Sequence, residues 1–183
     1  MRLRTILVMA AILVALGVFF FLSGRPKTVP QPEPRMFVWS VEMQDLKAVA
    51  VSLPREGKSE SWVKHEDKYW YFDKPGGPKV NMKRWGGGIP LLLSGPAAER
   101  LIADNATDEQ LEMYGLKDPK MKIGLVLENT NTIDIEVGDS TPDGQAYYIK
   151  PAASKVIYTV DYTWYEVLER LVLEPPYPES QEK

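Results

Sequence analysis

The chain has 183 residues, of which 44% are hydrophobic and 26% are charged, so it contains enough apolar material for a folded domain with a real core. Four of its 22 Lys and Arg and one of its 25 Asp and Glu precede Arg35, which leaves a net charge of −6 on residues 35–183. That charge argues against a phosphate-backbone partner, so no nucleic acid is expected. The absence of cysteine excludes disulfide bonds, thiolate nucleophiles and cysteine-ligated metal sites.

Residues 1–24 are predicted to form an N-terminal transmembrane anchor. Apolar residues run from Ile6 to Leu22, and Thr5–Gly24 would give about 30 Å of helix, the thickness of the hydrocarbon core. Arg2 and Arg4 weakly favour a cytoplasmic N-terminus and an exported C-terminal domain, periplasmic or lumenal. The alternative is a cleaved signal peptide, but bulky residues stand where a small-x-small cleavage site would lie. We therefore expect a single-pass membrane protein with a retained signal anchor in the lipid bilayer.

A proline-rich linker is predicted over residues 25–35. Prolines 26, 30, 32 and 34 preclude a helix and favour polyproline II, which rises about 3.1 Å per residue. The segment is therefore expected to be a spacer between the anchor and a folded domain. A proline ligand for a partner protein is the alternative, but the flanking basic and aromatic residues of such ligands are missing.

Residues 36–175 are predicted to form one α+β domain, a mainly antiparallel sheet of hairpins with two or three short helices. A C-terminal tail is expected over residues 176–183. Two hairpins are expected where strands flank turn residues, one around His65 and one around Pro151–Ser154. Alternating apolar side chains predict four further strands. These strands lie at Phe37–Val41, Val49–Leu53, Ile123–Leu127 and Ile133–Val137.

Three helical segments punctuate the predicted strands. Thr107 with Gln110, and Thr163 with Glu166, have the spacing of a capping box, in which the two side chains satisfy free backbone amides. The second of these helices carries an apolar stripe suited to packing on a sheet. Asn81–Leu93 contains three consecutive glycines and a proline, so a short or broken helix is expected there.

The sequence shows no established catalytic, cofactor-binding or metal-binding set. Gly57-Lys58-Ser59 lacks the upstream glycine of a phosphate-binding loop. Gly86-Gly87-Gly88 lacks the surrounding strand and helix pattern of a dinucleotide site, so packing or flexibility is the favoured interpretation. His65, the one histidine, lies in a charged turn without a second histidine for a metal. We therefore expect no cofactor and no enzymatic activity.

Four carboxylates lie close together in the sequence, and such density is compatible with calcium binding or proton sharing. Asp134 and Glu136 alternate with apolar residues, as on the solvated face of a strand, and Asp143 belongs to a Thr-Pro-Asp-Gly turn. Solvated carboxylates are therefore the favoured interpretation. An enzyme that uses Asp139 and Asp143 is the less favoured alternative.

Aromatic residues are plentiful, with five Trp and nine Tyr. Exposed rings make good anchors for a protein partner or a glycan. In Tyr69-Trp70-Tyr71-Phe72 both faces of one strand carry a ring, so at least one face should meet another element or a partner. The candidate partner-binding residues are Trp70, Tyr71, Trp85 and Tyr147.

Several motifs resemble the domain of unknown function 4340 family. Its most specific part is Tyr114-Gly115-Leu116-x-x-Pro119 followed by Val137-Gly138-Asp139-x-Thr141-Pro142-x-Gly144. The other matching motifs are Trp70-Tyr71-x-x-x-Pro75, Tyr147-Tyr148 and Val156-x-Tyr158. The resemblance covers about Met36–Leu173 and implies a bacterial, membrane-anchored α+β domain on the outer side of the cytoplasmic membrane. Some relatives are associated with transporter-linked gliding proteins, and the family supplies no accepted catalytic residues.

The resemblance also bears on location and function. Trp85–Gly95 departs from the ordinary helix of the family and is similar to members from photosynthetic bacteria, which implies a thylakoid membrane. We therefore expect a non-enzymatic, membrane-anchored accessory or assembly protein whose exported domain docks on a membrane protein complex, photosynthetic or transporter-linked. The alternatives are an envelope glycan-binding module that uses exposed tryptophans and the carboxylate-dependent enzyme.

Overall fold

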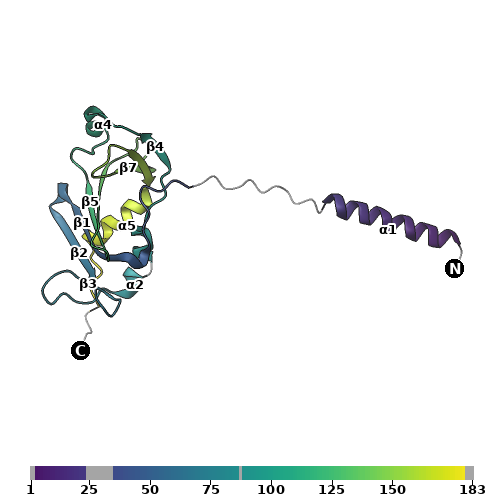
Figure 1. Ribbon diagram of the computed structural model, residues 1–183, viewed down its shortest axis with the longest axis horizontal. Coiled ribbons are helices and arrows are strands. Elements are labelled where there is room, and N and C mark those ends of the chain that lie inside the picture. The colour runs from purple at the N-terminus through teal and green to yellow at the C-terminus, as the bar shows by residue number, and fades with distance from the viewer. Residues whose placement is uncertain (1–2, 24–34, 87, 180–183) are drawn as a thin grey trace. The chain divides into compact units, whose positions relative to one another are not determined.

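The computed structural model describes residues 3–23, 35–86 and 88–179 (Figure 1). Contacts along the chain separate two compact units, residues 1–34 and residues 35–183. The predicted proline-rich linker lies outside the described residues except for Arg35.

The first unit contains one helix, α1, over Leu3–Ser23. The side chains described in it are those of residues 7–21, and all of them are exposed. Within the residues that the structure describes, no helix combines the length and the hydropathy that crossing a membrane requires. The expected transmembrane helix is therefore not detected in this part of the chain, and residues 1–2 and 24 of the predicted anchor lie outside it.

The second unit is built on an eight-stranded antiparallel sheet with the order β3-β2-β1-β5-β6-β7-β8-β4. With the few short helices around it, this sheet confirms the predicted α+β class. Both predicted hairpins are present, as β2 with β3 and as β7 with β8. The strands are β1 Leu46–Leu53, β2 Lys58–Lys64, β3 Trp70–Phe72, β4 Arg100–Ala103, β5 Met121–Leu127, β6 Thr132–Ser140, β7 Ala146–Pro151 and β8 Ile157–Asp161.

The helices of this unit are short except for the last. They are α2 Met82–Trp85, α3 Gly88–Leu93, α4 Asp108–Met113 and α5 Tyr162–Leu173, with 3-10 turns η1 Met43–Asp45 and η2 Pro54–Glu56. The break predicted within residues 81–93 is confirmed. Gly86 follows α2 with φ +52°, a backbone conformation that glycine adopts without strain, and α3 begins two residues later.

The prediction of a strand over Phe37–Val41 is wrong. Phe37 makes only an isolated bridge to Ala97, and the consecutive residues Val38 and Trp39 are both buried, so the alternation of a strand does not hold. The Trp39 indole N–H donates to the Leu93 carbonyl at 3.1 Å. That contact fixes the segment beside α3 instead of inside the sheet.

One of the two predicted capping boxes is confirmed. The Thr107 hydroxyl accepts the Gln110 N–H at 3.3 Å, and the Thr107 N–H donates to the Gln110 side chain at 3.0 Å. The box at Thr163 is wrong, because α5 begins at Tyr162 and the Asp161 carboxylate accepts the Thr163 N–H at 2.8 Å. The carboxylate is the stronger acceptor, and it starts the helix earlier.

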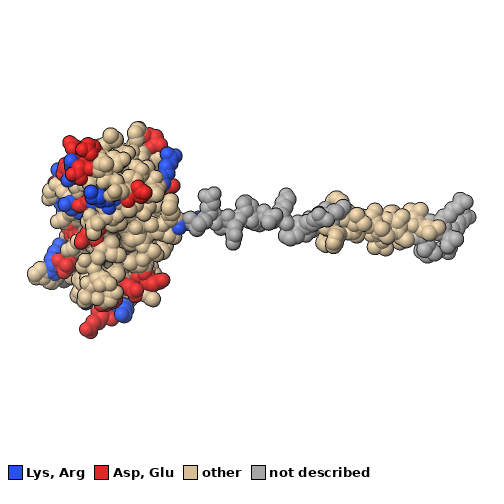
Figure 2. Space-filling view, turned by 45° about the horizontal axis from the view of Figure 1, so that its top comes forward, with Lys and Arg blue, Asp and Glu red and all other residues tan. Residues whose placement is uncertain are grey.

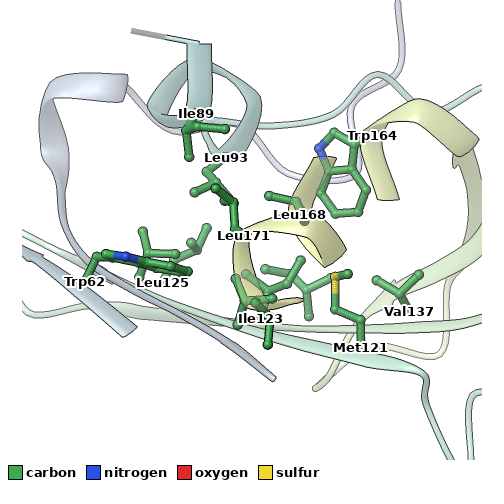
Figure 3. Packing of buried hydrophobic residues seen from close by; sticks show 14 of the residues in the cluster. Trp62, Ile89, Leu93, Met121, Ile123, Leu125, Val137, Trp164, Leu168 and Leu171 are labelled. Atoms are coloured by element: carbon green, nitrogen blue, oxygen red, sulfur yellow. The ribbon is translucent and has the colours of Figure 1, made fainter. Parts of the chain in front are cut away.

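The main core lies between one face of the sheet and α5. Figure 3 shows Leu168 and Leu171 of α5 close to Ile123 and Met121 of β5, all of which are buried. The Trp164 indole N–H donates to the Leu92 carbonyl at 3.1 Å, which attaches α3 to the same helix. A second, smaller apolar cluster contains Ala106, Leu116 and Ile157 and joins the α4 region to β8.

Candidate functional site

The two most specific motif segments pack directly against each other. The Asp139 N–H donates to the Tyr114 carbonyl at 2.9 Å. A Cβ on Gly138 would lie 2.1 Å from the Tyr114 carbonyl oxygen, and one on Gly115 would lie 2.3 Å from Asp139 Oδ2. Gly115 also has φ +69°, which favours glycine. Both glycines therefore allow an approach that a larger residue would prevent, and this motif contact is structural.

Asp139 is held by ion pairs at the same contact. Its Oδ1 lies 2.9 Å from Arg55 Nη1 and 3.7 Å from Lys120 Nζ. Arg55 Nε also donates to the Asp118 carbonyl at 3.0 Å, so the guanidinium connects η2 to the segment that leads into β5. The Asp139 carboxylate thus positions neighbouring segments.

A pocket of about 330 Å³ lies where the turn after β6 meets β4, β7 and β8. Asp143 lines this pocket and Asp139 does not, so the two carboxylates of the enzyme hypothesis do not face each other across it. Its polar side chains include Arg100, Thr141, Asp143, Tyr148 and the buried Thr159. With Glu99, which also lines it, the pocket combines one cation, two carboxylates and three hydroxyls, a set suited to binding a polar group.

Hydrogen bonds keep Asp143 ionised. Its Oδ1 accepts the Thr141 hydroxyl at 2.6 Å and the Gln145 N–H at 3.2 Å. These bonds, with Arg100 nearby, hold the pKa of the Asp143 carboxyl below its ordinary value of 3.8. Burial, and then the neighbouring Tyr114 and Asp143, raise the pKa of the Tyr148 hydroxyl. At neutral pH the pocket therefore offers a carboxylate acceptor and a phenol donor.

The other two carboxylates of the predicted acidic group are separate from this pocket. Asp134 is exposed, and Glu136 Oε2 lies 2.8 Å from Nζ of the buried Lys150. Among the residues with described positions, no group of three or more His, Cys, Asp or Glu is placed to hold a metal ion. Glu136 instead neutralises a buried lysine, which would otherwise be costly.

Two of the four predicted partner-binding residues lie in the core, which corrects that expectation for them. Trp70 is 5% exposed and Trp85 is 1% exposed, with ring centroids 5.3 Å apart. Neither ring presents a surface to a partner. In β3, Trp70 and Phe72 point into the core. The opposite face of this strand carries Tyr71, which is half-buried.

Tyr71 and Tyr147 are half-buried and engaged with neighbours in the same chain. The Tyr71 hydroxyl donates to Asp67 Oδ2 at 2.7 Å, and its ring stacks on the exposed His65 at 4.2 Å. Tyr147 stacks on Tyr165 with centroids 3.9 Å apart. Both are therefore partly covered by their own chain.

All five tryptophans of the chain are buried, the most exposed at 9%. The envelope glycan-binding alternative requires exposed indoles, so it loses its premise. The five residues are Trp39, Trp62, Trp70, Trp85 and Trp164.

Gly57 has a turn role. It ends η2 with φ +65°, where its N–H donates to the Pro54 carbonyl at 3.2 Å, and Lys58 then begins β2. Gly57 therefore lies in the turn between β1 and β2, and Lys58 and Ser59 belong to β2.

Sequence reasoning missed a set of exposed apolar side chains at the start of the second unit. Met36 (48%), Phe37 (49%), Met43 (46%) and Leu91 (65%) are exposed, and we call these four residues the N-proximal surface. Backbone hydrogen bonds join residues 36–38 to residues 96–98, just after α3, and η1 packs against α3. The one available signal was Leu91-Leu92-Leu93, because a single helical turn cannot direct three consecutive side chains into one core.

Figure 2 shows an area without Lys, Arg, Asp or Glu on one face of the second unit, with charged side chains above it, below it and along the left edge of the view. That area is uncharged and includes polar residues, whereas a contiguous exposed apolar patch marks an interaction site in soluble domains. The same criterion draws attention to the N-proximal surface.

The fold and the packed motif contact define the protein as an α+β domain on a meandering antiparallel sheet, preceded by an apolar helix. Within it, residues 92–172 match the family model described as Domain of unknown function (DUF4340), which confirms the resemblance derived from the motifs. The match contains β4–β8, α4 and nearly all of α5, whereas β1–β3 lie before it. No curated protein and no solved structure matches the chain.

Proposed function

We propose that this protein is a non-enzymatic, membrane-anchored accessory or assembly protein whose folded unit docks on a membrane protein complex. The observation that carries the proposal is the N-proximal surface, where four large apolar side chains are each between 46% and 65% exposed. Grouped apolar side chains of this size gain free energy when a partner covers them, at about 25 cal/mol per Å².

The covalent structure supports a partner in the same membrane. Eleven residues lie between Ser23, the last residue of α1, and Arg35, and a fully extended chain spans at most about 3.5 Å per residue. Met36 follows Arg35, so the covalent chain permits at most about 45 Å between the end of α1 and the first residue of this surface. A complex embedded in that membrane is within reach.

The anchor itself is part of the proposal. Every described side chain of α1, from Leu7 to Phe21, is exposed, and water is an unfavourable environment for such a helix. We place the N-terminus in the cytoplasm and the folded unit in the periplasm or the thylakoid lumen, on the basis of Arg2 and Arg4. The membrane complex would accordingly be transporter-linked or photosynthetic.

Alkaline extraction of membranes tests the anchor. The full chain is expected to remain in the pellet, whereas replacing Leu13 and Val14 by arginine should release it, because each arginine costs about 3 kcal/mol at the centre of a span. A Met113→Arg variant, altered on α4 of the second unit, is the control and should stay with the membrane. Release of the unaltered chain would refute the anchor.

Photo-crosslinking in membranes tests the docking. A photoreactive amino acid at Leu91 should give one stoichiometric adduct with a membrane protein, since the side chain is 65% exposed on the N-proximal surface. The matched control is the same amino acid at Met113, which is 70% exposed on α4 and should give no such adduct. Equal labelling from both positions, or recovery of the protein alone from detergent, would count against the proposal.

The carboxylates that an enzyme would use here are poorly suited to catalysis, which supports a non-enzymatic function. Asp139 is neutralised by Arg55 and Lys120, and Asp143 is held ionised, so it is a poor proton donor. The chain has no cysteine, and its one histidine is exposed in the turn between β2 and β3. Binding is the activity that these groups favour.

A further inference from the structure

The segment after α5 packs against β3 and α2 of the same unit. We call Glu174–Tyr177 the C-terminal strap. The Asn81 N–H donates to the Pro176 carbonyl at 2.8 Å, and Arg84 Nη1 donates to the Pro175 carbonyl at 3.0 Å. A further Arg84 bond reaches the Glu174 carbonyl, and Pro176 is buried. Three successive strap carbonyls are thus satisfied by two residues at one place.

Tyr177, the aromatic residue at the end of the strap, contacts Phe72 and Lys74. The Tyr177 ring stacks on Phe72 with centroids 4.2 Å apart and planes 5° apart. Lys74 Nζ lies 4.6 Å from the Tyr177 ring centroid and 5.1 Å from that of Phe72, and it also bonds the Tyr177 hydroxyl. Phe72, Lys74, Asn81 and Arg84 together form what we call the strap groove.

The chemistry of the strap groove suits a Pro-Pro-aromatic segment. Prolines have no N–H to satisfy, so a groove that supplies only donors to carbonyls fits them without leaving an orphan group. A flat aromatic platform beside those donors is how folded domains bind proline-rich peptides. A hollow of about 250 Å³, lined by Arg84, Val167, Leu171 and Pro176 among others, continues the groove along α5.

We infer that the strap groove is a recognition site for Pro-Pro-Tyr segments and that its ligand in trans is the strap of a second copy of this chain. The ligand is identified because it is the segment already seated there, so a second copy offers the same three carbonyls and the same ring. The strap follows directly on the last residue of α5, and exchange of an identical element between copies is a low-cost route to dimers.

A synthetic peptide with the sequence of residues 173–179 tests the recognition. The peptide is expected to bind two variants about tenfold or more tightly than it binds the unaltered chain. These variants are a chain that ends at Leu173 and a full chain with Tyr177→Ala. In the unaltered chain the tethered strap competes with the peptide at high effective concentration. Lys74→Ala in the shortened chain should weaken binding, and Met113→Ala should not. A peptide with alanine in place of the tyrosine is the ligand control.

Circular dichroism first establishes that the variants are folded, and if the shortened chain is not, the Tyr177→Ala chain decides. A folded variant that shows no saturable binding overturns the inference and leaves the strap as an internal closure. For the second copy, tagged and untagged full chains are co-expressed, and the tag should recover the untagged chain. Tyr177→Ala in both copies should remove that recovery, and Met113→Ala should not. Recovery that is absent, or unaffected by Tyr177→Ala, overturns the second copy as the ligand.

Discussion

Glycine at two motif positions sets the distance between the segment after α4 and β6. The space at Gly138 is closed by a backbone oxygen, which cannot rotate away, whereas the space at Gly115 is closed first by the Asp139 side chain. The more rigid obstacle lies at Gly138. Substitution there should therefore disturb the motif contact more directly than any change to the ion pairs around Asp139.

Gly138→Ala is expected to destabilise the protein by about 1–3 kcal/mol, because the added methyl group must displace the Tyr114 carbonyl. Gly124→Ala is the matched control, since it also lies within a strand but its Cβ would meet only Asp134 Oδ1 at 3.5 Å. That variant should remain within about 0.5 kcal/mol of the original or gain stability. Urea unfolding measures both, and equal destabilisation would contradict the role of the motif contact.

Asp143 should make the stability of the protein depend on pH in the acidic range. A carboxyl whose folded-state pKa is depressed contributes stability above its ordinary value of 3.8 and loses that contribution as the pH falls through the folded-state pKa. Thr141→Val removes the first hydrogen bond, so the pKa of Asp143 should rise toward 3.8. Thr141→Ser keeps the hydroxyl and should leave it low. Carbon-detected NMR titration of the carboxyl distinguishes these outcomes, and an unchanged pKa in the valine variant would contradict the assignment.

Composition alone does not predict which aromatic side chains are buried. The number of rings could be counted, but two of the buried indoles find their hydrogen-bond acceptors far away in the sequence. Trp39 and Trp164 enter the core because the Leu93 and Leu92 carbonyls satisfy their indole N–H groups. Those acceptors are 54 and 72 residues away, a pairing that no local pattern encodes.

At the scale of elements, local chemistry predicted most of the structure. Strong alternation located β1, β5 and β6, and turn residues located both hairpins, because these signals operate within a few residues. The failures are Phe37–Val41, which lies beside α3, and β4, whose four residues carry no alternation and depend on β8 for pairing. The pocket that contains Asp143 could not be predicted, because β4 forms one of its walls.

The two helix starts supply a test of cap assignment. Thr107→Ala should cost about 1 kcal/mol, because it removes the side-chain acceptor of the confirmed capping box. Asp161→Ala should cost a similar amount, since Asp161 caps α5. Glu166→Ala should have little effect, because the capping box of Thr163 with Glu166 does not form. Thermal unfolding compares the three, and a large loss for Glu166→Ala together with none for Asp161→Ala would reverse the assignment.

For the molecule as a whole, the described core residues all lie in the second unit. Among the residues whose burial the structure describes, those of the main cluster extend from Val38 to Val172, and none of them belongs to the first unit. The DUF4340 match covers only residues 92–172, yet β1 pairs with β5, so the sheet joins the matched region to the strands before it. The folding unit is therefore larger than the matched region.

A chain that begins at Arg35 is expected to fold with the same melting temperature as the full chain, within about 2 °C, because no core contact is lost. A chain that begins at Leu92 is the counterpart and should not fold, since it leaves β5 without β1. Differential scanning calorimetry measures both. A fall of many degrees in the Arg35 chain would show that α1 contributes to the stability of the second unit.

The place of β4 at the end of the sheet has a kinetic consequence. Its partner β8 lies more than fifty residues later, with Arg100 opposite Thr159, whereas β5 to β8 join neighbours along the chain. Closing so long a loop costs entropy that the sequential hairpins do not incur, and β4 has a single partner strand, so β4 should dock after β5–β8 during folding and release its amides to deuterium before them. The wall that β4 contributes to the pocket containing Asp143 would then open more often than the walls formed by β7 and β8.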